Sequence, residues 1–533
     1  MRRGPVATSR PVRRAGWRVG SALIALALVL LPARPAPAQD GSPARVRAAL
    51  AQLDTLAAQS LQRTGIPGMA IGVVSRDEVV YLKGFGVREA GTDQAVDADT
   101  VFQLASVSKP IASTVVAALV GDGVVGWDDH IVDHDPTFQM YDPWVTREVT
   151  LRDMFAHRSG LPDHAGDLLE DLGYDRTEVL HRLRYQRPDT SFRSTYNYTN
   201  FGLTEAAVAA ARAAGESWED LSAERLYRPL GMTATSSRFA DFEAAPNHAL
   251  THVQVDGRWE PRYVRDPDAQ SPAGGVSSTV RDLAQWMRLQ LAGGRIDGRQ
   301  LVAADALAET HRPQIVSNPA KDPAVDHTGF YGLGWNVSYD DAGRVRWGHS
   351  GAFANGAATV VTLVPAEQLG IVVLTNAAPI GAAEVVALDF LDLALEGHLT
   401  RDWAAVVAPA FAALNASPYD RGIDFTRPPA DARPALPAAS YVGTYANELF
   451  GDAEVVADGD GLALRLGPGR TTFPLQHYDR DVFTYQPAGE NAAGPSGVRF
   501  QIGPDQTATS VTIDNLDVDG QGTFTRPNGE PSP

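Results

Sequence analysis

Two serines and a lysine follow an apolar run in the stretch "FQLASVSKP", at positions 102–110. Residues three apart lie on one face of a helix, so Lys109 can reach back toward the Ser106 hydroxyl. A serine hydroxyl is a weak nucleophile that needs a base beside it, and a lysine supplies that base only when its pKa is lowered. The simpler interpretation is a helix start, with Ser106 as its N-cap and Lys109 in solvent. The motif therefore needs partners elsewhere in the chain.

A phenol and an amide stand two residues apart in the stretch "TYNYTNFG", at positions 195–202. If this segment is extended or a loop, Tyr198 and Asn200 lie on the same side of it. A tyrosine can share a proton with a lysine, and an asparagine can orient an amide or ester carbonyl. The alternative is a loop that packs through its aromatic rings.

A third polar stretch, "RWGHSGAFANG" at positions 346–356, is predicted to lie between two strands. It offers a polar ring at His349 and a glycine, Gly351, that permits close approach of the backbone. The same letters nearly match the G-x-S-x-G elbow of α/β-hydrolases, with Ser350 as the nucleophile. That elbow needs a helix after it, whereas the residues that follow are β-branched and typical of a strand.

The three motifs, in the order SxxK, YxN and HxG, resemble those of the class C β-lactamase and penicillin-binding-protein family of serine hydrolases. That family includes esterases and D-aminopeptidases. The resemblance covers about Ala44 to Gly397, and three further segments also resemble family sequences: "TLRDMFAHRSGLPDH" (150–164), "SPAGGVSSTVRDLAQW" (271–286) and "FYGLGW" (330–335). The strands near the C-terminus resemble the lipocalin-like domain that some members carry.

The resemblance implies catalytic roles for the first two motifs. Ser106 would be the acylated nucleophile, with Lys109 as its base. Tyr198 would move protons during acylation and deacylation, and Asn200 would bind the substrate amide.

The resemblance also implies roles for the third motif. His349 and Gly351 would line the strand opposite the nucleophile, and the backbone N–H groups of Ser106 and Ala352 would form the oxyanion hole. The β-lactamases of this group carry Lys-Thr-Gly where this chain has His-Ser-Gly. An imidazole in place of an ammonium weakens the case for a β-lactamase and suits the peptidase and esterase relatives.

The remaining pattern predicts elements that position these motifs. Positions 68–87 form a predicted hairpin, positions 356–376 form two more strands, and helices are predicted between them. We expect an α/β fold in which an antiparallel sheet is flanked by helices and interrupted by an all-helical subdomain, as in the serine β-lactamases. The predicted hydrolase domain spans residues 44–400.

A change of pattern follows the hydrolase domain. Residues 401–436 are predicted to be a helix and a Pro-rich linker, and short strands with turn signals occupy residues 437–528. They predict a small all-β domain, barrel-like in form. Its aromatic residues are more typical of a core than of a carrier site, and we expect the domain to shape or cover the catalytic cleft.

The N-terminus has the pattern of an export signal. Several arginines precede ten apolar residues at positions 22–31, and a small-x-small site ends at Ala38. This pattern predicts a signal peptide over residues 1–38 and a periplasmic or secreted protein. Ten apolar residues are about half of a membrane span, so no stable anchor is expected after cleavage. The pair Arg13-Arg14 leaves the export route open between the general and the twin-arginine pathways.

Charge and composition exclude several classes of function. Residues 1–38 hold seven arginines and no acidic residue, which leaves 39 basic and 64 acidic residues in the processed chain. So negative a protein is not expected to bind nucleic acid or anionic membranes. The absence of cysteine excludes disulfides, thiolate metal sites and a cysteine nucleophile.

Two groups of polar residues are predicted to be structural. The acidic stretch "DDHIVDHDP" (128–136) lacks a regular ligand spacing and is interpreted as a solvated loop, while His157 and His164 flank a predicted turn. We therefore expect no metal and no cofactor.

The function that the sequence favours is an exported serine hydrolase. It would form an acyl-enzyme on Ser106 and hydrolyse an ester or peptide bond, which could involve a D-amino acid, in a small-molecule or peptide substrate. The alternative is a penicillin-binding or peptide-sensing protein that is acylated without efficient turnover.

Overall fold

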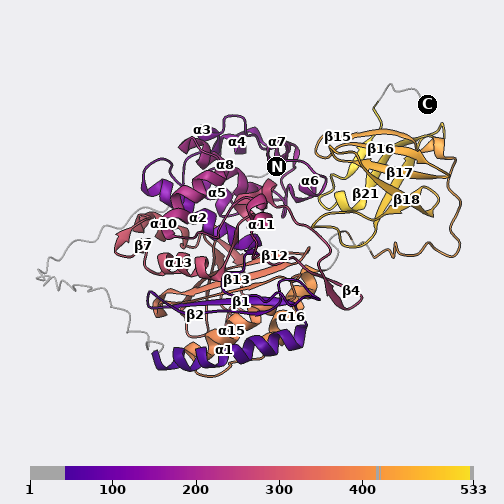
Figure 1. Ribbon diagram of the computed structural model, residues 1–533. Helices are drawn as coiled ribbons and strands as arrows, with labels where there is room; N and C mark the ends of the chain where they lie inside the picture. The colour runs from indigo at the N-terminus through magenta and orange to yellow at the C-terminus, as the bar shows by residue number, and fades with distance from the viewer. Residues whose placement is uncertain (1–42, 416–418, 420–421, 528–533) are drawn as a thin grey trace, which may run out of the picture. The chain divides into compact units, whose positions relative to one another are not determined.

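The computed structural model describes residues 43–415, 419 and 422–527 of the chain (Figure 1). The predicted signal peptide, residues 1–38, lies outside these described residues. Within them, no helix is both long enough and apolar enough to cross a membrane. The described chain comprises an eight-stranded sheet with helices, a helical region and a closed barrel of eight strands.

The sheet brings the first and last strands of the hydrolase region together, as predicted. Its antiparallel strand order is β2-β1-β14-β13-β12-β11-β10-β9, and Met69 of β1 pairs with Thr375 of β14. Figure 1 shows the indigo strand β1 beside the later orange strands. The strand bounds are β1 (Gly68–Ser75), β2 (Glu78–Gly86), β9 (Ile315–Asn318), β10 (Gly329–Tyr331), β11 (Asn336–Tyr339), β12 (Val345–Phe353), β13 (Ala357–Val364) and β14 (Leu369–Thr375).

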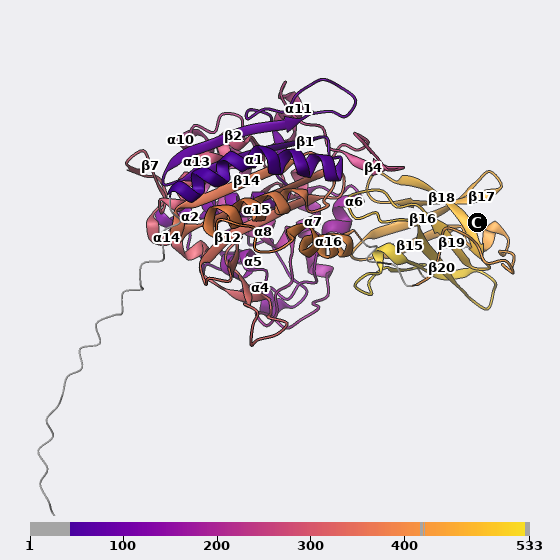
Figure 2. The ribbon, with the colours of Figure 1, turned by 90° about the horizontal axis from the view of Figure 1, so that it is seen from below.

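Helices cover both faces of this sheet. Every residue of β14 is buried, as expected for a central strand with a layer on each side. On one face α1 (Pro43–Thr64) and α15 (Ala382–Leu395) share an apolar core with β1 and β14, and α16 (Trp403–Leu414) packs against α15 (Figure 2). On the other face lies α13 (Val280–Leu291), whose N-cap Thr279 accepts a hydrogen bond from the Asp282 N–H. The predicted hairpin at positions 68–87 and the two predicted strands at positions 356–376 are confirmed.

The helical region interrupts the sheet between β2 and β9. Its central helix, α2 (Ser108–Gly121), has twelve buried residues, which is typical of a helix packed on all sides. The other helices are α3 (Ile131–His134), α4 (Pro143–Glu148), α5 (Leu151–Phe155), α6 (Asp167–Asp171), α7 (Arg176–Arg182), α8 (Asn200–Ala214), α9 (Trp218–Ser222), α10 (Arg228–Leu230), α11 (Phe239–Ala244), α12 (Ser271–Gly274) and α14 (Ala304–Thr310). Three small antiparallel pairs accompany them: β3 (Phe102–Gln103) with β6 (Ser277–Ser278), β4 (Val253–Val255) with β5 (Arg258–Glu260), and β7 (Arg295–Ile296) with β8 (Arg299–Gln300).

The C-terminal strands close into an antiparallel barrel, which confirms the predicted all-β fold. The rings of Tyr441, Phe483 and Phe500 are buried against one another, with centroids 4.9–5.7 Å apart. Such packing is that of an ordinary core. The strands are β15 (Gly443–Asn447), β16 (Gly451–Asp458), β17 (Gly461–Leu466), β18 (Thr471–Asp479), β19 (Val482–Tyr485), β20 (Ser496–Ile502), β21 (Ala508–Ile513) and β22 (Thr523–Thr525).

Candidate active site

Ser106 lies at the sharp entry into α2. It belongs to a single 3₁₀ turn, Ala105–Val107, and α2 begins at Ser108 with Val107 as its N-cap, so Ser106 is not the N-cap of this helix. The preceding residue, Ala105, has a φ of +47°, a conformation that costs energy for any residue with a Cβ. Ser106 is partly exposed between buried neighbours, so the tight turn presents its hydroxyl at a surface.

Lys109 is fully buried below the serine, so the interpretation of a solvated lysine is wrong. Its Nζ donates hydrogen bonds to Ser106 Oγ at 3.0 Å, to Asn200 Oδ1 at 2.6 Å and to the Ala273 carbonyl at 3.0 Å. These three acceptors match the three N–H bonds of an ammonium group.

Burial lowers the pKa of Lys109 to about 7, although the nearby charge of Asp167 opposes this shift. The amine is therefore neutral in part of the molecules at neutral pH. A neutral amine has two N–H bonds and one lone pair. If Asn200 Oδ1 and the Ala273 carbonyl keep the two N–H bonds, the lone pair faces Ser106 Oγ. This arrangement is the one that a general base for Ser106 requires.

Tyr198 contacts the same oxygen from the other side. Its Oη donates a hydrogen bond to Ser106 Oγ at 2.7 Å, and its ring centroid lies 4.4 Å from Lys109 Nζ. Burial raises the pKa of Tyr198 well above its usual value, so the phenol keeps its proton. In this state Tyr198 can give a proton, whereas Lys109 is the group able to accept one.

The structure differs from the prediction for Asn200. Residues 195–199 lie outside any helix or strand, as expected for a loop, but Asn200 is the first residue of α8. The chain turns inward at Thr199, whose N–H donates to His157 Nδ1 at 3.2 Å. The His157 ring is fully buried, 4.7 Å from the Tyr198 ring. His157 thus supports the segment that carries both site residues.

Gly351 brings strand β12 against the nucleophile. The third motif lies within β12 rather than between strands, because its residues pair with β13 in unbroken register. A Cβ at Gly351 would lie 2.1 Å from the Leu104 carbonyl oxygen and 3.0 Å from Ser106 N, so only glycine fits. The structure shows the close approach that the sequence suggested. The oxyanion role of the Ser106 and Ala352 N–H groups is still a prediction.

Ser350 occupies the middle of the same strand. The chain continues from it through β12 into strand β13, with no helix after the serine. The α/β-hydrolase elbow is therefore absent at this position.

His349 is buried and neutral. Its Nε2 lies 2.9 Å from Tyr331 Oη, and its Nδ1 lies 2.6 Å from the Ser350 carbonyl oxygen. Because a carbonyl oxygen only accepts hydrogen bonds, the second contact is a hydrogen bond when Nδ1 carries the proton. Burial, with Lys109 nearby, lowers the pKa of His349 to about 3. We therefore do not expect His349 to bind a substrate carboxylate as an imidazolium between pH 5 and 8.

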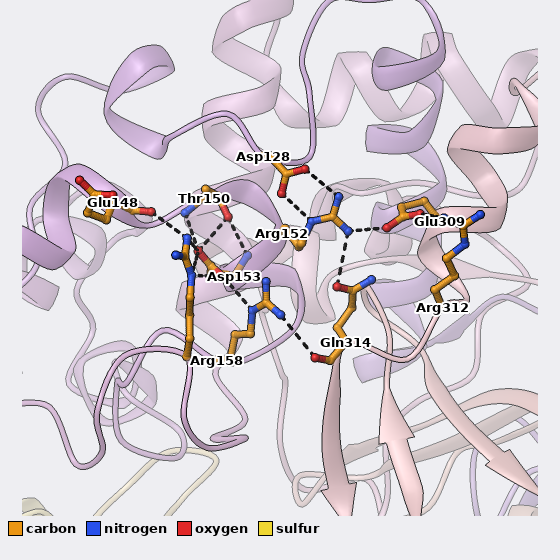
Figure 3. Close-up of polar contacts among 10 residues, drawn as sticks. Asp128, Glu148, Thr150, Arg152, Asp153, Arg158, Glu309, Arg312 and Gln314 are labelled. Atoms are coloured by element: carbon orange, nitrogen blue, oxygen red, sulfur yellow. Dashed lines mark hydrogen bonds and ion pairs between the residues drawn. The ribbon is translucent and has the colours of Figure 1, made fainter. Parts of the chain in front are cut away.

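A second polar cluster surrounds Asp153 (Figure 3). Asp153 is completely buried and accepts hydrogen bonds from Thr150, Arg158 and Arg193. Arg193 N–H also donates to the Arg158 carbonyl oxygen at 2.8 Å. Because Arg158 follows His157 and Arg193 precedes Tyr198 by five residues, this cluster holds together the two segments that meet behind the site.

Several residues that contact the site were not predicted. His157 and His164 were interpreted as structural, and Tyr331, Asp167 and the Ala273 carbonyl were not singled out. Asp167 Oδ2 accepts a hydrogen bond from Asn200 Nδ2 at 2.8 Å. His157, His164, Ala273 and Tyr331 lie within the three further segments that resemble family sequences, but the resemblance gave them no role at the site, and Asp167 lies outside those segments.

The acidic stretch is occupied by protein contacts. His134 Nε2 lies 2.9 Å from Asp129 Oδ2, and Asp135 forms an ion pair with Arg212. Asp135 is buried, so the stretch is less solvated than predicted.

Comparison with known proteins assigns this site to a family. A family model described as "Beta-lactamase" matches residues 53–396. The chain belongs to the β-lactamase family. A second model, described as "Domain of unknown function (DUF3471)", matches residues 427–527, which contain the barrel. The predicted relationship to β-lactamases and penicillin-binding proteins is therefore confirmed.

Three individual proteins are similar to this chain. An unguisins hydrolase of Aspergillus campestris is 25% identical over 85% of this chain and 87% of its own. Penicillin-binding protein 4 of Amycolatopsis lactamdurans is 29% identical over 72% of this chain and 94% of its own. A penicillin-binding protein homologue from Pyrococcus abyssi has the same fold, with a TM-score of 0.56 and 18% identity over 87% of this chain and 98% of that one.

Proposed function

We propose that this serine hydrolase of the β-lactamase family forms an acyl-enzyme on Ser106 and hydrolyses an ester or peptide bond. One observation carries the proposal: Ser106 Oγ is contacted by a buried lysine and by a protonated tyrosine, at 3.0 and 2.7 Å. A base and an acid on either side of one partly exposed hydroxyl are what acyl transfer needs.

The reaction begins when the neutral amine of Lys109 takes the Ser106 proton. Oγ then bonds to the substrate carbonyl carbon, and the carbonyl oxygen becomes an oxyanion facing the N–H groups of Ser106 and Ala352. The bond to the leaving group breaks as that group takes the phenol proton of Tyr198, which the Lys109 ammonium replaces. Water, deprotonated by Lys109, attacks the ester, and Ser106 regains its proton as the acid product leaves.

The neutral His349 supports peptides and esters over β-lactams. A substrate carboxylate would find no fixed ammonium on β12, because the imidazole there is uncharged and both its nitrogens have partners. The relatives include one named for hydrolysis and one named for penicillin binding, and the former name favours turnover. We therefore propose a small-molecule or peptide substrate, which could include a D-amino acid.

Turnover by the purified protein tests the proposal. The substrates are p-nitrophenyl acetate, a D-alanine p-nitroanilide and a chromogenic cephalosporin, each with wild type and with Ser106→Ala. We expect hydrolysis of the ester or the anilide to exceed that of the cephalosporin and to vanish in S106A. Equal rates in wild type and S106A would overturn the role of Ser106.

The sensing alternative is separated by the lifetime of the acyl-enzyme. Acid quenching followed by intact mass measurement shows whether Ser106 is acylated and for how long. A hydrolase gives an adduct that disappears as product accumulates, whereas one stoichiometric adduct that persists would establish the penicillin-binding alternative.

Export is proposed from the N-terminal sequence alone. Expression of the full chain in a Gram-negative host should yield a periplasmic or secreted protein whose first residue follows Ala38. Recovery of only the uncleaved chain in the cytoplasm would contradict this.

A further inference from the structure

Asp167 lies directly behind the amide that faces Lys109. Its Oδ2 accepts hydrogen bonds from Asn200 Nδ2 and from His164 Nδ1, each at 2.8 Å. The other carboxylate oxygen, Oδ1, is buried and has no hydrogen-bond partner in the described part of the chain. The residue is 5% exposed, so its charge is little screened by water.

Local backbone geometry places Asp167 there. The preceding Gly166 has a φ of +97°, and a Cβ at that position would lie 2.8 Å from the ring of Phe201. Phe201 follows Asn200 in α8. Glycine at 166 therefore allows the start of α6 to meet the start of α8, and the Asp167 carboxylate reaches the Asn200 amide. The same loop contains His164, whose backbone N–H donates a hydrogen bond to the Tyr198 carbonyl oxygen at 2.7 Å.

The contact determines which end of the Asn200 amide faces the lysine. A carboxylate accepts hydrogen bonds and does not donate, so it selects the Nδ2 end of the amide. Oδ1 must then face Lys109 Nζ, which lies 2.6 Å away. We propose that Asp167, braced by His164, is a positioning residue of the acylation reaction: it fixes the orientation of the Asn200 amide and supplies a negative charge behind Lys109. This inference rests on the proposed role of Ser106.

The orientation of the amide decides where the lysine lone pair points. With Oδ1 toward Nζ, the amine spends one N–H bond on Asn200 and one on the Ala273 carbonyl, and its lone pair faces Ser106 Oγ. With the amide reversed, Nδ2 would offer a hydrogen to that lone pair and compete with the serine. Asp167 therefore aims the base through Asn200.

The charge of Asp167 decides at which pH the base is available. Burial lowers the pKa of Lys109, and Asp167 is the charge that raises it again. The other titratable groups facing Lys109 are His157, His164, His349 and Tyr198. Burial keeps His157 and His349 neutral and Tyr198 protonated. Burial also opposes the charged form of His164, but the hydrogen bond to Asp167 and the charge of that carboxylate raise the pKa of His164 above its usual value. Without Asp167, Lys109 would lose its proton at lower pH.

Three kinds of variant separate orientation from charge. Asp167→Asn and Asp167→Ser remove the charge but keep an oxygen that can accept from Asn200 Nδ2. Asp167→Ala removes both the charge and the acceptor, and Asn200→Ala removes the amide itself. Asp282→Asn is the matched control, because Asp282 is a buried carboxylate that accepts from Ala234 N and Thr235 Oγ1 in the α13 layer.

The readout is the second-order rate of reaction with a fluorophosphonate between pH 5 and 9, on the full-length protein, with the adduct located by mass spectrometry. In wild type we expect the rate to rise with a midpoint around pH 7, as Lys109 loses its proton, and to reach a plateau above it. In D167N and D167S the midpoint should move to lower pH by about one unit, with the plateau retained. In D167A the plateau should also fall by about tenfold or more, as in N200A.

A double-mutant cycle then tests whether Asp167 acts through Asn200. The plateau of D167A/N200A should equal that of N200A, because the amide that Asp167 positions is already gone. Additive losses, or an unmoved midpoint in both D167N and D167S, would overturn the inference. D282N should change neither quantity, and a shift there equal to that of D167N would also overturn it. A wild type that is not labelled on Ser106 would instead contradict the proposed function.

Discussion

Two buried polar clusters of the hydrolase domain use charge in opposite ways. Around Asp153, a single carboxylate receives hydrogen bonds from two arginines and from Thr150, and its pKa is lowered despite complete burial. Around Lys109, a single cation faces a hydroxyl, an amide and a carbonyl, all of them neutral, and its pKa is lowered. The Asp153 cluster stabilises the charged carboxylate, whereas the surroundings of Lys109 favour the neutral amine.

This contrast in the surroundings of Asp153 and Lys109 distinguishes a structural ion network from a catalytic site. Both contain buried ionisable groups, so burial alone does not distinguish them. In the Asp153 cluster each charge has opposite charges in direct contact. In the Lys109 cluster the balancing carboxylate, Asp167, lies one amide away, and its Oδ1 has no hydrogen-bond partner among the described residues. A buried lysine whose pKa is lowered, beside a partly exposed serine hydroxyl, indicates a catalytic site.

The largest expected effect is the loss of the base. Lys109→Met keeps an unbranched chain in the cavity and removes the amine, so kcat/KM should fall by about 10²–10⁴-fold. The free energy of unfolding should fall less than when a buried ion pair is broken, because Nζ contacts only neutral groups, although the Asn200 and Ala273 oxygens lose a donor. Steady-state kinetics and chemical denaturation measure the two quantities. Full activity in K109M would remove Lys109 from the mechanism.

The matching change in the other cluster should act mainly on stability. Asp153→Ala leaves Arg158 and Arg193 without their carboxylate, and the free energy of unfolding should fall by about 3 kcal/mol. This value lies at the low end of the usual cost of breaking a buried ion pair, because the Arg193 side chain is 45% exposed and partly solvated. Urea denaturation measures this change. A stability loss in D153A no greater than that in K109M would erase the distinction between the clusters.

The pH dependence of stability sharpens the same contrast. Since the arginines and Thr150 lower the pKa of Asp153, its contribution is present above the unfolded value of about 3.9 and is lost as pH falls through the folded value. Wild type should therefore lose more stability than D153A between pH 5 and pH 3. Parallel stability curves for the two proteins over that range would contradict the assignment.

The smallest expected effect concerns His349. Because burial keeps this imidazole neutral down to a pKa of about 3, its charge does not change between pH 5 and 8. KM for an anionic substrate, a p-nitrophenyl ester of a dicarboxylic acid, should be flat over that range, while kcat follows Lys109. A KM that rises with a midpoint near 6.5 would show that His349 does bind carboxylate as a cation.

The sequence predicted the fold class and the residues that gather at Ser106, for identifiable reasons. The strands of residues 68–87 and 356–376 are continuous apolar runs, and such patterns depend on local sequence alone. Ser106 and Lys109 stand one turn apart on a helix, so their contact also follows from spacing. The start of α8 at Asn200 was missed because the interaction that ends the extended segment, Thr199 N–H with His157, spans 42 residues.

The groups behind the site could not be predicted from local pattern. His164, Asp167 and Asn200 meet because Gly166 allows α6 to approach Phe201, and no spacing rule links positions 164 and 200. The neutral state of His349 also depends on burial and on Tyr331, which is 18 residues earlier in the chain. Such properties come from packing between distant segments.

The central claim is that Ser106 is the nucleophile and that Lys109 activates it. The most direct test is reaction of the purified protein with a fluorophosphonate, followed by location of the modified peptide by mass spectrometry, in wild type and in K109M. We expect one adduct, on Ser106, formed rapidly by wild type and at least about 10²-fold more slowly by K109M. An adduct on Ser350, or equal labelling of Ser106 in both proteins, would contradict it.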